Sequence, residues 1–316
     1  MNAAPREGRA VGIDVGGTKL LAIAIDGRGE VVAEQRTPSL RDGPALIDAI
    51  ADLAGAVGPV GALAVGLPGL IQQGVLRFAA NLPGIVELPA AAMLEERVGA
   101  PVVLSNDATL AAWGEHARGA AVGVDDALVV TLGTGIGAGL ILGGRLYEGA
   151  HGMAGEIGHV LVDPDGPPCP CGQRGCWERY ASGSALGRLG GLAAEGGRAP
   201  ALLAAAGGDP LAVRGEHVVA AARAGDHGAR TVMDEFAGWV AVGLANMVNV
   251  FDPAVIVLGG GLAEAGDVLL EPVRQRTTGL VEASAHRPAV EIRLALLGER
   301  AGALGAAFWA LEKFFA

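Results

Sequence analysis

The sequence contains few lysines, few aromatic residues and no cluster of positive charge. Lys19 and Lys313 are the only lysines among 23 basic residues, and aromatic residues make up 4% of the 316-residue chain. The formal net charge is −11, and the arginines are spread along the chain, so no stretch suits the phosphate backbone of nucleic acid. We therefore do not expect nucleic acid as a partner.

Long uninterrupted apolar runs are also absent. The stretch 128–142 is broken by glycines and the stretch 236–251 contains Asn246 and Asn249, so neither suits a membrane span. Asp14 interrupts the first apolar residues, which argues against a signal peptide. We expect a cytoplasmic protein without a membrane partner.

The remaining composition favours a folded α/β protein with two domains. Hydrophobic residues make up 51% and charged residues 18% of the chain, which supports a sizeable core, and the length is about twice that of a typical domain. Apolar residues alternate on both sides of Gly16-Gly17, as in a β-hairpin, and a similar unit recurs around 128–142. We expect a small N-terminal α/β lobe over 1–120, a larger α/β lobe over 121–300, and a terminal helix over 301–316 that packs back on the first lobe. Strands are predicted over 11–15, 21–25, 30–35, 60–66, 101–104, 128–132, 140–142 and 254–258, and helices over 44–57, 90–98, 230–250 and 301–315.

Three glycine turns follow three of these strands. They contain Gly16-Gly17, the Gly133–Gly139 stretch and Gly259-Gly260-Gly261. Residues without a Cβ let backbone amides approach phosphate oxygens. Any one of these turns alone is more simply interpreted as a tight turn, whereas three together favour phosphate binding. The chain has no Walker A motif, and the Gly133–Gly139 stretch lacks the spacing of a dinucleotide-binding loop.

All three cysteines fall in one eight-residue window. Cys169, Cys171 and Cys176 provide three thiolates, and His159 lies ten positions before the first of them. Zn²⁺ favours four tetrahedral S or N ligands, so these residues predict a closed, structural zinc site. The alternatives are free buried cysteines, or one disulfide with a spare thiol.

Two motifs carry a family resemblance. Asp-x-Gly-Gly-Thr-Lys at 14–19 resembles the first phosphate motif of the actin, heat-shock ATPase and sugar-kinase superfamily. Gly-Glu-Ile-Gly-His at 155–159, followed by Cys-x-Cys-Gly-x-x-Gly-Cys-x-Glu ending at Glu178, resembles the hallmark of the ROK family (repressors, open reading frames and kinases). The resemblance implies a two-lobed actin-like ATPase (ribonuclease H-like) fold with a nucleotide and sugar cleft between the lobes.

The resemblance also implies roles for individual residues. Asp107 would be the general base, although from the residues alone an N-cap of the following helix is equally plausible. Asp14 would orient the Mg²⁺ that accompanies ATP. The terminal phosphates would face Gly16, Gly17, Thr18, Lys19, Gly133, Thr134 and Gly135, and Gly259, Gly260 and Gly261 would lie near the adenosine. The sugar would contact Asn81, Asn106, Asp107, Glu156, His159 and Glu178, so that His159 both binds zinc and donates to the sugar.

The implied activity is ATP-dependent phosphorylation of glucose at the 6-hydroxyl, because the motifs are most similar to those of bacterial glucokinases. Kinases for fructose, mannose, allose or N-acylmannosamine share most of these residues and stay open as alternatives. A sugar-responsive repressor of the same family is disfavoured, because about ten residues precede the first strand where such repressors carry a helix-turn-helix. ROK kinases are commonly dimers or tetramers, so we expect a homo-oligomer.

Overall fold

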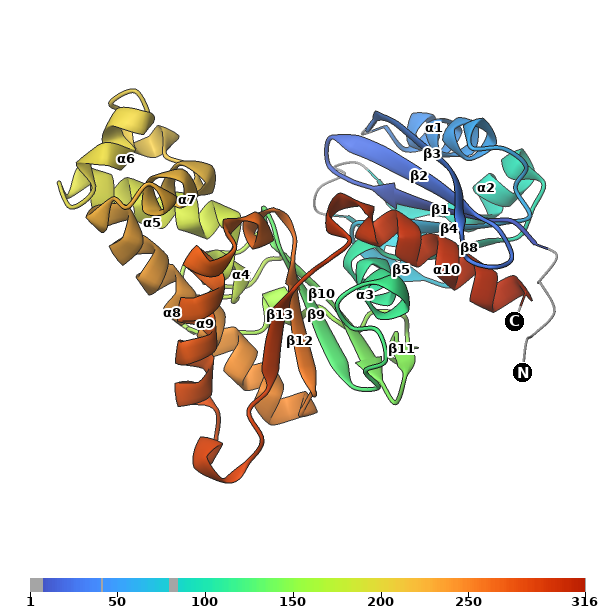
Figure 1. Ribbon diagram of the computed structural model, residues 1–316. Coiled ribbons are helices and arrows are strands. Elements are labelled where there is room, and N and C mark those ends of the chain that lie inside the picture. Colours follow the sequence, from blue (N-terminus) through green and yellow to red (C-terminus); the bar gives the residue numbers. More distant parts are fainter. Residues whose placement is uncertain (1–7, 41, 80–84, 316) are drawn as a thin grey trace. The chain divides into compact units, whose positions relative to one another are not determined.

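The computed structural model describes residues 8–40, 42–79 and 85–315, and it divides into two compact units (Figure 1). Unit 1 comprises Met1–Asp125, Gly139–Gly155 and Leu296–Ala316, and unit 2 comprises Asp126–Ala138 and Glu156–Ala295. The sequence suggested a single boundary near residue 120 and a returning C-terminal helix. The segment 139–155 instead lies with unit 1, because it packs against residues of that unit: a Cβ on Gly139 would lie 2.4 Å from Cβ of Ala112, and one on Gly152 would lie 3.1 Å from the carbonyl oxygen of Ile71.

The central sheet of unit 1 begins with the predicted hairpin. Its strands are β1 (Ala10–Val15), β2 (Lys19–Ile25), β3 (Val31–Pro38), β4 (Ala62–Leu67) and β8 (Val102–Asn106), in the order β3-β2-β1-β4-β8. Strands β1, β2 and β3 are antiparallel, whereas β1, β4 and β8 are parallel. Every residue of β4 is buried, as expected of a strand with helices on both faces of its sheet.

Alternate residues of β1 face two different helix layers. Val11, Ile13 and Val15 share a hydrophobic core with α1 (Gly43–Ala56) and α2 (Ala90–Val98). On the other face, α10 (Ala301–Phe315) packs against β1, β4 and α3 (Asp107–Arg118). A Cβ on Gly12 would lie 2.1 Å from the carbonyl oxygen of Ala303, so this close approach depends on glycine.

A second, small sheet in unit 1 was not predicted. It contains β5 (Leu70–Gln72), β6 (Val75–Phe78) and β7 (Val86–Leu88), in that order. Strand β4 ends at Leu67 and β5 begins at Leu70, so Pro68 and Gly69 alone separate them. Strands of three or four residues are too short to show a periodic pattern.

The second five-stranded sheet repeats the strand order of the first. It contains β9 (Ala127–Leu132), β10 (Ile136–Leu142), β11 (Arg145–Tyr147), β12 (Val255–Gly259) and β13 (Glu291–Leu294), in the order β11-β10-β9-β12-β13. Numbered along the chain within each sheet, both read 3-2-1-4-5. The predicted recurrence of the hairpin-like unit thus extends to the whole sheet. Strand β10 begins at Ile136, so the glycine turn is shorter than expected.

The helices of unit 2 include the long helix predicted over 230–250, which is α8 (His227–Phe251). The other α-helices are α4 (Glu178–Ala181), α5 (Gly183–Glu195), α6 (Pro200–Ala205), α7 (Gly215–Arg223) and α9 (Asp267–Leu280). Short 3₁₀ helices lie in unit 2 at Ile157–His159, Pro210–Ala212, Gly261–Ala265 and Ser284–His286, and in unit 1 at Gly298–Arg300. None of the described helices has both the length and the apolar character needed to cross a membrane.

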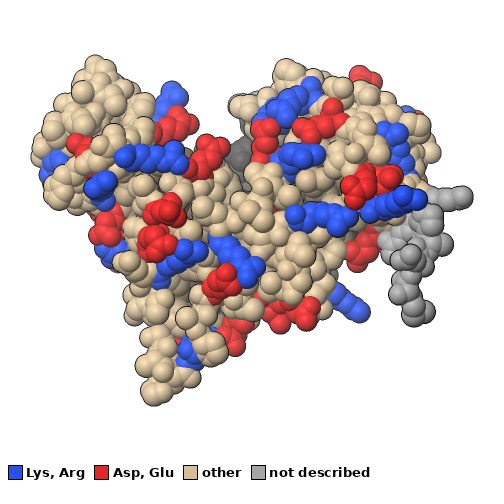
Figure 2. Space-filling model, viewed as in Figure 1, with Lys and Arg blue, Asp and Glu red and all other residues tan. Residues whose placement is uncertain are grey.

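Charges of both signs are mixed on the surface. On the face drawn in Figure 2, Lys and Arg side chains lie beside Asp and Glu side chains. The ion pairs include Arg36 with Glu34 at 3.0 Å and Arg300 with Glu34 at 3.0 Å. These exposed pairs contribute little to stability individually.

Candidate functional site

Two acids lie at the carboxyl ends of the parallel strands in unit 1. Asp14 of β1 pairs in register with Gly66 of β4, and Gly66 pairs with Ser105 of β8, directly before Asn106 and Asp107. A Cβ on Gly66 would lie 3.2 Å from the Cα of Asp107 and 3.7 Å from Oδ1 of Asp14. The absent side chain of Gly66 therefore lets both acids approach one strand end, the usual position of ligands in open α/β sheets.

Both acids have raised pKa values. Burial raises the pKa of Asp14 to about 7, the charge of Asp107 adds to this effect, and Lys19 opposes it. Burial likewise raises the pKa of Asp107, while the backbone N–H of Ala108 opposes the change. Raised pKa values in neighbouring carboxyl groups are typical of sites that bind a cation or accept a proton.

The N-cap of α3 is Asn106, and Asp107 is the first helical residue. The side-chain oxygen of Asn106 accepts hydrogen bonds from the N–H groups of Ala108 at 2.9 Å and Thr109 at 3.2 Å. Its Nδ2 donates to the carbonyl oxygen of Gly69 at 3.4 Å. The capping role weighed for Asp107 thus belongs mainly to Asn106, although Oδ1 of Asp107 also accepts from Ala108 at 2.9 Å.

The first glycine turn connects β1 to β2. The N–H of Gly16 donates to the carbonyl oxygen of Lys19 at 3.0 Å, and Gly17 and Thr18 are exposed at the tip. The Lys19 ammonium forms an ion pair with Glu299, which also pairs with Arg36 at 3.1 Å. The lysine expected to face phosphates is therefore held by a carboxylate of the segment that leads into α10.

Helix α10 also contacts Asp14 directly. A Cβ on Gly302 would lie 2.7 Å from Cγ of Asp14, so the first turn of α10 leaves room for this carboxylate only because residue 302 is glycine. Neither Gly302 nor the role of Gly66 was predicted from the sequence. Both act through tertiary proximity, for which the sequence pattern carries no signal.

The second and third glycine turns both belong to unit 2. The N–H of Gly133 donates to the carbonyl oxygen of Gly135 at 3.0 Å, and Ser184 Oγ donates to the carbonyl oxygen of Thr134 at 2.8 Å. Gly260 has a φ of 77°, and a Cβ there would lie 2.5 Å from the carbonyl oxygen of Leu132. The structure thus brings Gly133, Thr134 and Gly135 close to Gly259, Gly260 and Gly261, at the ends of neighbouring strands.

The predicted metal ligands converge. One ligand atom from each of His159, Cys169, Cys171 and Cys176 lies within 4.8 Å of all the others. Cys171 Sγ lies 3.6 Å from Cys176 Sγ, and Cys169 Sγ lies 3.7 Å from His159 Nδ1. Tetrahedral ligands about 2.0–2.3 Å from a Zn²⁺ ion would lie roughly 3.6–3.8 Å apart. The residues therefore fit a four-coordinate zinc site.

Glu156 and Glu178 flank the imidazole of this cluster. Glu156 Oε2 lies 3.7 Å from His159 Nε2, whereas Glu178 Oε1 lies 3.8 Å from Nδ1 and accepts from Cys169 Sγ at 3.1 Å. A Cβ on Gly135 would lie 2.7 Å from Glu178 Oε2. Glu178 thus lies between the cysteine cluster and the second glycine turn.

Trp177 anchors the cysteine segment to α8. Its indole is fully buried, and Nε1 donates to the carbonyl oxygen of Trp239 at 2.7 Å. A Cβ on Gly243 would lie 1.9 Å from the indole ring, so the helix accommodates the indole only through this glycine.

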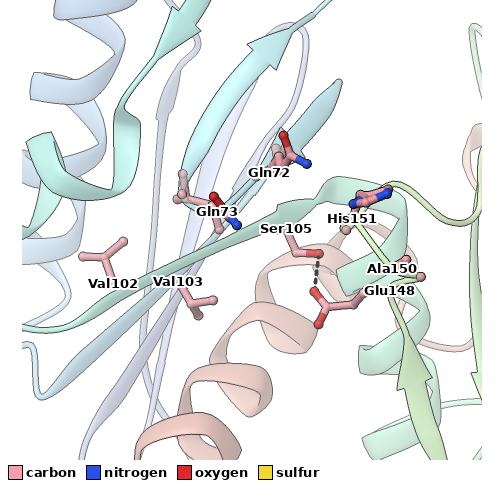
Figure 3. A pocket seen from close by; sticks show the side chains of 13 residues that line it. Gln72, Gln73, Val102, Val103, Ser105, Glu148, Ala150 and His151 are labelled. Carbon is pink, nitrogen blue, oxygen red and sulfur yellow. Dashed lines mark hydrogen bonds between the residues drawn. The ribbon is translucent and has the colours of Figure 1, made fainter.

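A pocket that the sequence did not indicate lies in unit 1 (Figure 3). It has a volume of about 370 Å³, and its lining includes Gln72, Gln73, Ser105, Glu148 and His151. Ser105 Oγ donates to Glu148 Oε1 at 3.4 Å, drawn as the dashed line in Figure 3. Lysine and arginine are absent from the lining residues, so this pocket does not favour phosphate. The remaining predicted sugar contact, Asn81, lies outside the described residues.

Comparison of the sequence with models of known protein families identifies the family of this chain. The model of the ROK family matches residues 10–313. The chain belongs to the ROK family. This membership confirms the resemblance inferred from the 155–178 motifs.

Curated relatives include enzymes and a regulator. A glucokinase of Streptomyces coelicolor is 40% identical over 312 residues, covering 96% of this chain and 98% of that protein. A xylose repressor of Bacillus subtilis is 29% identical, covering 98% of this chain and 78% of the repressor.

Among solved structures, a ROK glucokinase from Streptomyces griseus in complex with glucose and AMPPNP is 37% identical with a TM-score of 0.86, covering 96% of this chain and all of that one. This similarity confirms the expected α/β class and the two-lobed actin-like ATPase fold.

Proposed function

We propose that this protein is an ATP-dependent glucose kinase that forms glucose 6-phosphate and ADP. The observation that carries the proposal is the pair Asp14 and Asp107 at the ends of β1 and β8, the two strands that flank β4, in a ROK chain 40% identical to a glucokinase over nearly its whole length. The glucose and AMPPNP named for the Streptomyces griseus structure support these substrates.

Asp107 is the general base of the proposed reaction. Phosphoryl transfer to an alcohol requires an acceptor for the hydroxyl proton, placed in line with the terminal phosphate. Burial raises the pKa of Asp107 above its usual range, which increases the basicity of its carboxylate. The carboxylate takes the proton of the 6-hydroxyl as the oxygen attacks the γ-phosphorus.

Asp14 and the glycine turns bind the nucleotide. Asp14 would hold the Mg²⁺ that accompanies ATP, and the ion would neutralise phosphate charge. Gly16, Gly17, Thr18 and Lys19 bind the terminal phosphates through backbone N–H groups and the Lys19 ammonium. Gly133, Thr134 and Gly135 provide further backbone N–H groups for phosphate. Gly259, Gly260 and Gly261 lie against the adenosine.

The sugar is bound by amide, carboxylate and imidazole groups. Asn106 contributes Nδ2, because its side-chain oxygen already caps α3. Glu156, Glu178 and the Nε2 side of His159 bind hydroxyls, since Nδ1 of His159 faces Cys169. Polar groups that a bound sugar covers discriminate between sugars, because the wrong hydroxyl arrangement leaves them unpaired.

The Cys169, Cys171, Cys176 and His159 cluster holds a structural Zn²⁺ in this proposal. A closed four-ligand site has no position for a reactive water, so its contribution is folding free energy for the segment that carries Glu178.

The test is ADP release by the purified protein across a panel of hexoses. We expect glucose to give the highest kcat/KM, and Asp107→Asn to lower kcat about 10²- to 10⁴-fold while binding glucose and ATP. Asp52→Asn, which changes an exposed carboxylate on α1, is the matched control and should match the wild type. Turnover strongest with another hexose would reassign the substrate, and a nearly normal kcat for Asp107→Asn would remove the base assignment.

A further inference from the structure

Glu115 is an almost fully buried carboxylate outside the residues assigned above. It lies in α3, eight residues after Asp107, and is 1% exposed. Its Oε2 accepts hydrogen bonds from the N–H groups of Ala120 at 2.7 Å and Leu296 at 3.2 Å, and its Oε1 accepts from Leu297 at 2.9 Å. A buried carboxylate requires such donors, because an unpaired one would carry a large desolvation cost.

This carboxylate fixes a particular stretch of chain. Leu296 is the residue at which the chain re-enters unit 1 from unit 2. The short helix Gly298–Arg300 begins two residues later, and α10 follows it directly. Space for the carboxylate is made by Gly119, where a Cβ would lie 2.0 Å from Glu115 Oε2. Glu115 thus holds the start of the segment 296–302 against the end of α3.

The segment 296–302 contacts two of the proposed nucleotide residues. Glu299 forms the ion pair with Lys19, and Gly302 packs so closely on Asp14 that a Cβ would lie 2.7 Å from its Cγ. A shift of this segment therefore moves the lysine of the first glycine turn and the carboxylate at the end of β1 together.

We propose that Glu115 is a positioning residue for the nucleotide: by anchoring Leu296 and Leu297 it sets the places of Lys19 and Asp14. The inference rests on the nucleotide roles proposed above for those two residues. A displacement of about 1 Å in a reacting group lowers rates up to about 100-fold, so a remote carboxylate with these contacts affects turnover.

The test is Glu115→Gln, which keeps the size of the side chain but places an NH₂ group against a backbone N–H. We expect the KM for ATP to rise about tenfold, with a fall in kcat and with the KM for glucose within about twofold of the wild type. A merely structural role would lower thermal stability and change both KM values alike, and that result would overturn the proposal.

Two further variants keep the test decisive. Leu297→Pro removes one donated hydrogen bond at a residue whose φ of −85° is close to that of proline, and it should shift the KM for ATP in the same direction by a smaller factor. Glu95→Gln is the matched control. Glu95 also accepts a hydrogen bond from a backbone N–H, but the donor is Val102, at 3.2 Å, and not a residue of the segment 296–302. Its KM for ATP should stay unchanged.

Asp14→Asn distinguishes an error in the proposed nucleotide roles from an error in the positioning role of Glu115. If Asp14→Asn leaves the ATP kinetics unchanged, the nucleotide roles themselves are wrong. If Asp14→Asn impairs ATP use while Glu115→Gln and Leu297→Pro do not, only the positioning role of Glu115 is refuted.

Discussion

Replacing Asp14 with asparagine should make the protein more stable while abolishing its activity. Burial and the neighbouring Asp107 raise the pKa of Asp14 from 3.8 to about 7, so the charged form of this carboxylate destabilises the ligand-free fold. The difference corresponds to about 4 kcal/mol, at about 1.4 kcal/mol per pH unit. Because the side chain is only partly buried, solvent screening reduces the expected gain to about 1–2 kcal/mol.

The sign of the pH dependence follows from proton linkage. The folded state holds the proton of Asp14 up to about pH 7, whereas the unfolded state releases it near the ordinary value, so stability from this group is lost as pH rises between them. The gain in Asp14→Asn should therefore be complete at pH 8 and smaller by more than half at pH 5.

Urea unfolding of both proteins at pH 8 and pH 5, freed of Mg²⁺ and nucleotide by dialysis rather than by a chelator, measures this difference. Avoiding the chelator leaves any zinc in place. The exposed control Asp52→Asn should show a small change at both pH values. Equal or lower stability of Asp14→Asn at pH 8 would refute the reasoning, as would a gain that does not depend on pH.

Three other substitutions probe unit 2. Cys171→Ser should lower zinc content and melting temperature together, because metal binding is coupled to folding, and unchanged zinc by elemental analysis would contradict the ligand set. Gly135→Ala places a Cβ 2.7 Å from Glu178 Oε2, so the KM for glucose should rise about tenfold with zinc retained; unaltered glucose kinetics would remove the sugar role of Glu178. Gly243→Ala should destabilise the protein by about 1–3 kcal/mol in urea, because its Cβ would overlap the indole of Trp177, and wild-type stability would show that the helix relaxes.

Much of the fold was predictable because long elements carry their own pattern. The helix over 44–57 shows apolar residues at helical spacing, and the structure has α1 over Gly43–Ala56. Helix α9 escaped prediction because Pro272 lies inside it, and proline normally ends a helix. The strands β5 to β7 are stabilised by pairing with one another. Segments this short show no periodic pattern from which the pairing could be predicted.

The candidate site divides in the same way. Motifs that are contiguous in sequence, such as residues 14–19 and 155–178, were visible without a structure. Gly66, Gly302 and Glu115 were not, because each matters through a neighbour more than 40 residues away in the chain or through backbone groups on another segment. The spacing of residues in the sequence predicts motifs whose members are close in the chain. The space around a buried acid depends on how distant segments pack, which the spacing does not show.

The shared 3-2-1-4-5 order of the two sheets has a consequence for redesign. Equivalent strand ends carry different chemistry: β8 ends at Asn106 and is followed by Asp107, whereas its counterpart β13 ends at Leu294 and is followed by Ala295. The second sheet thus has the same strand order without an acid at this strand end. An engineer who wants a second carboxylate or a metal-binding group in this scaffold therefore already has a backbone position of known geometry at Ala295, beside Gly259 of the third glycine turn.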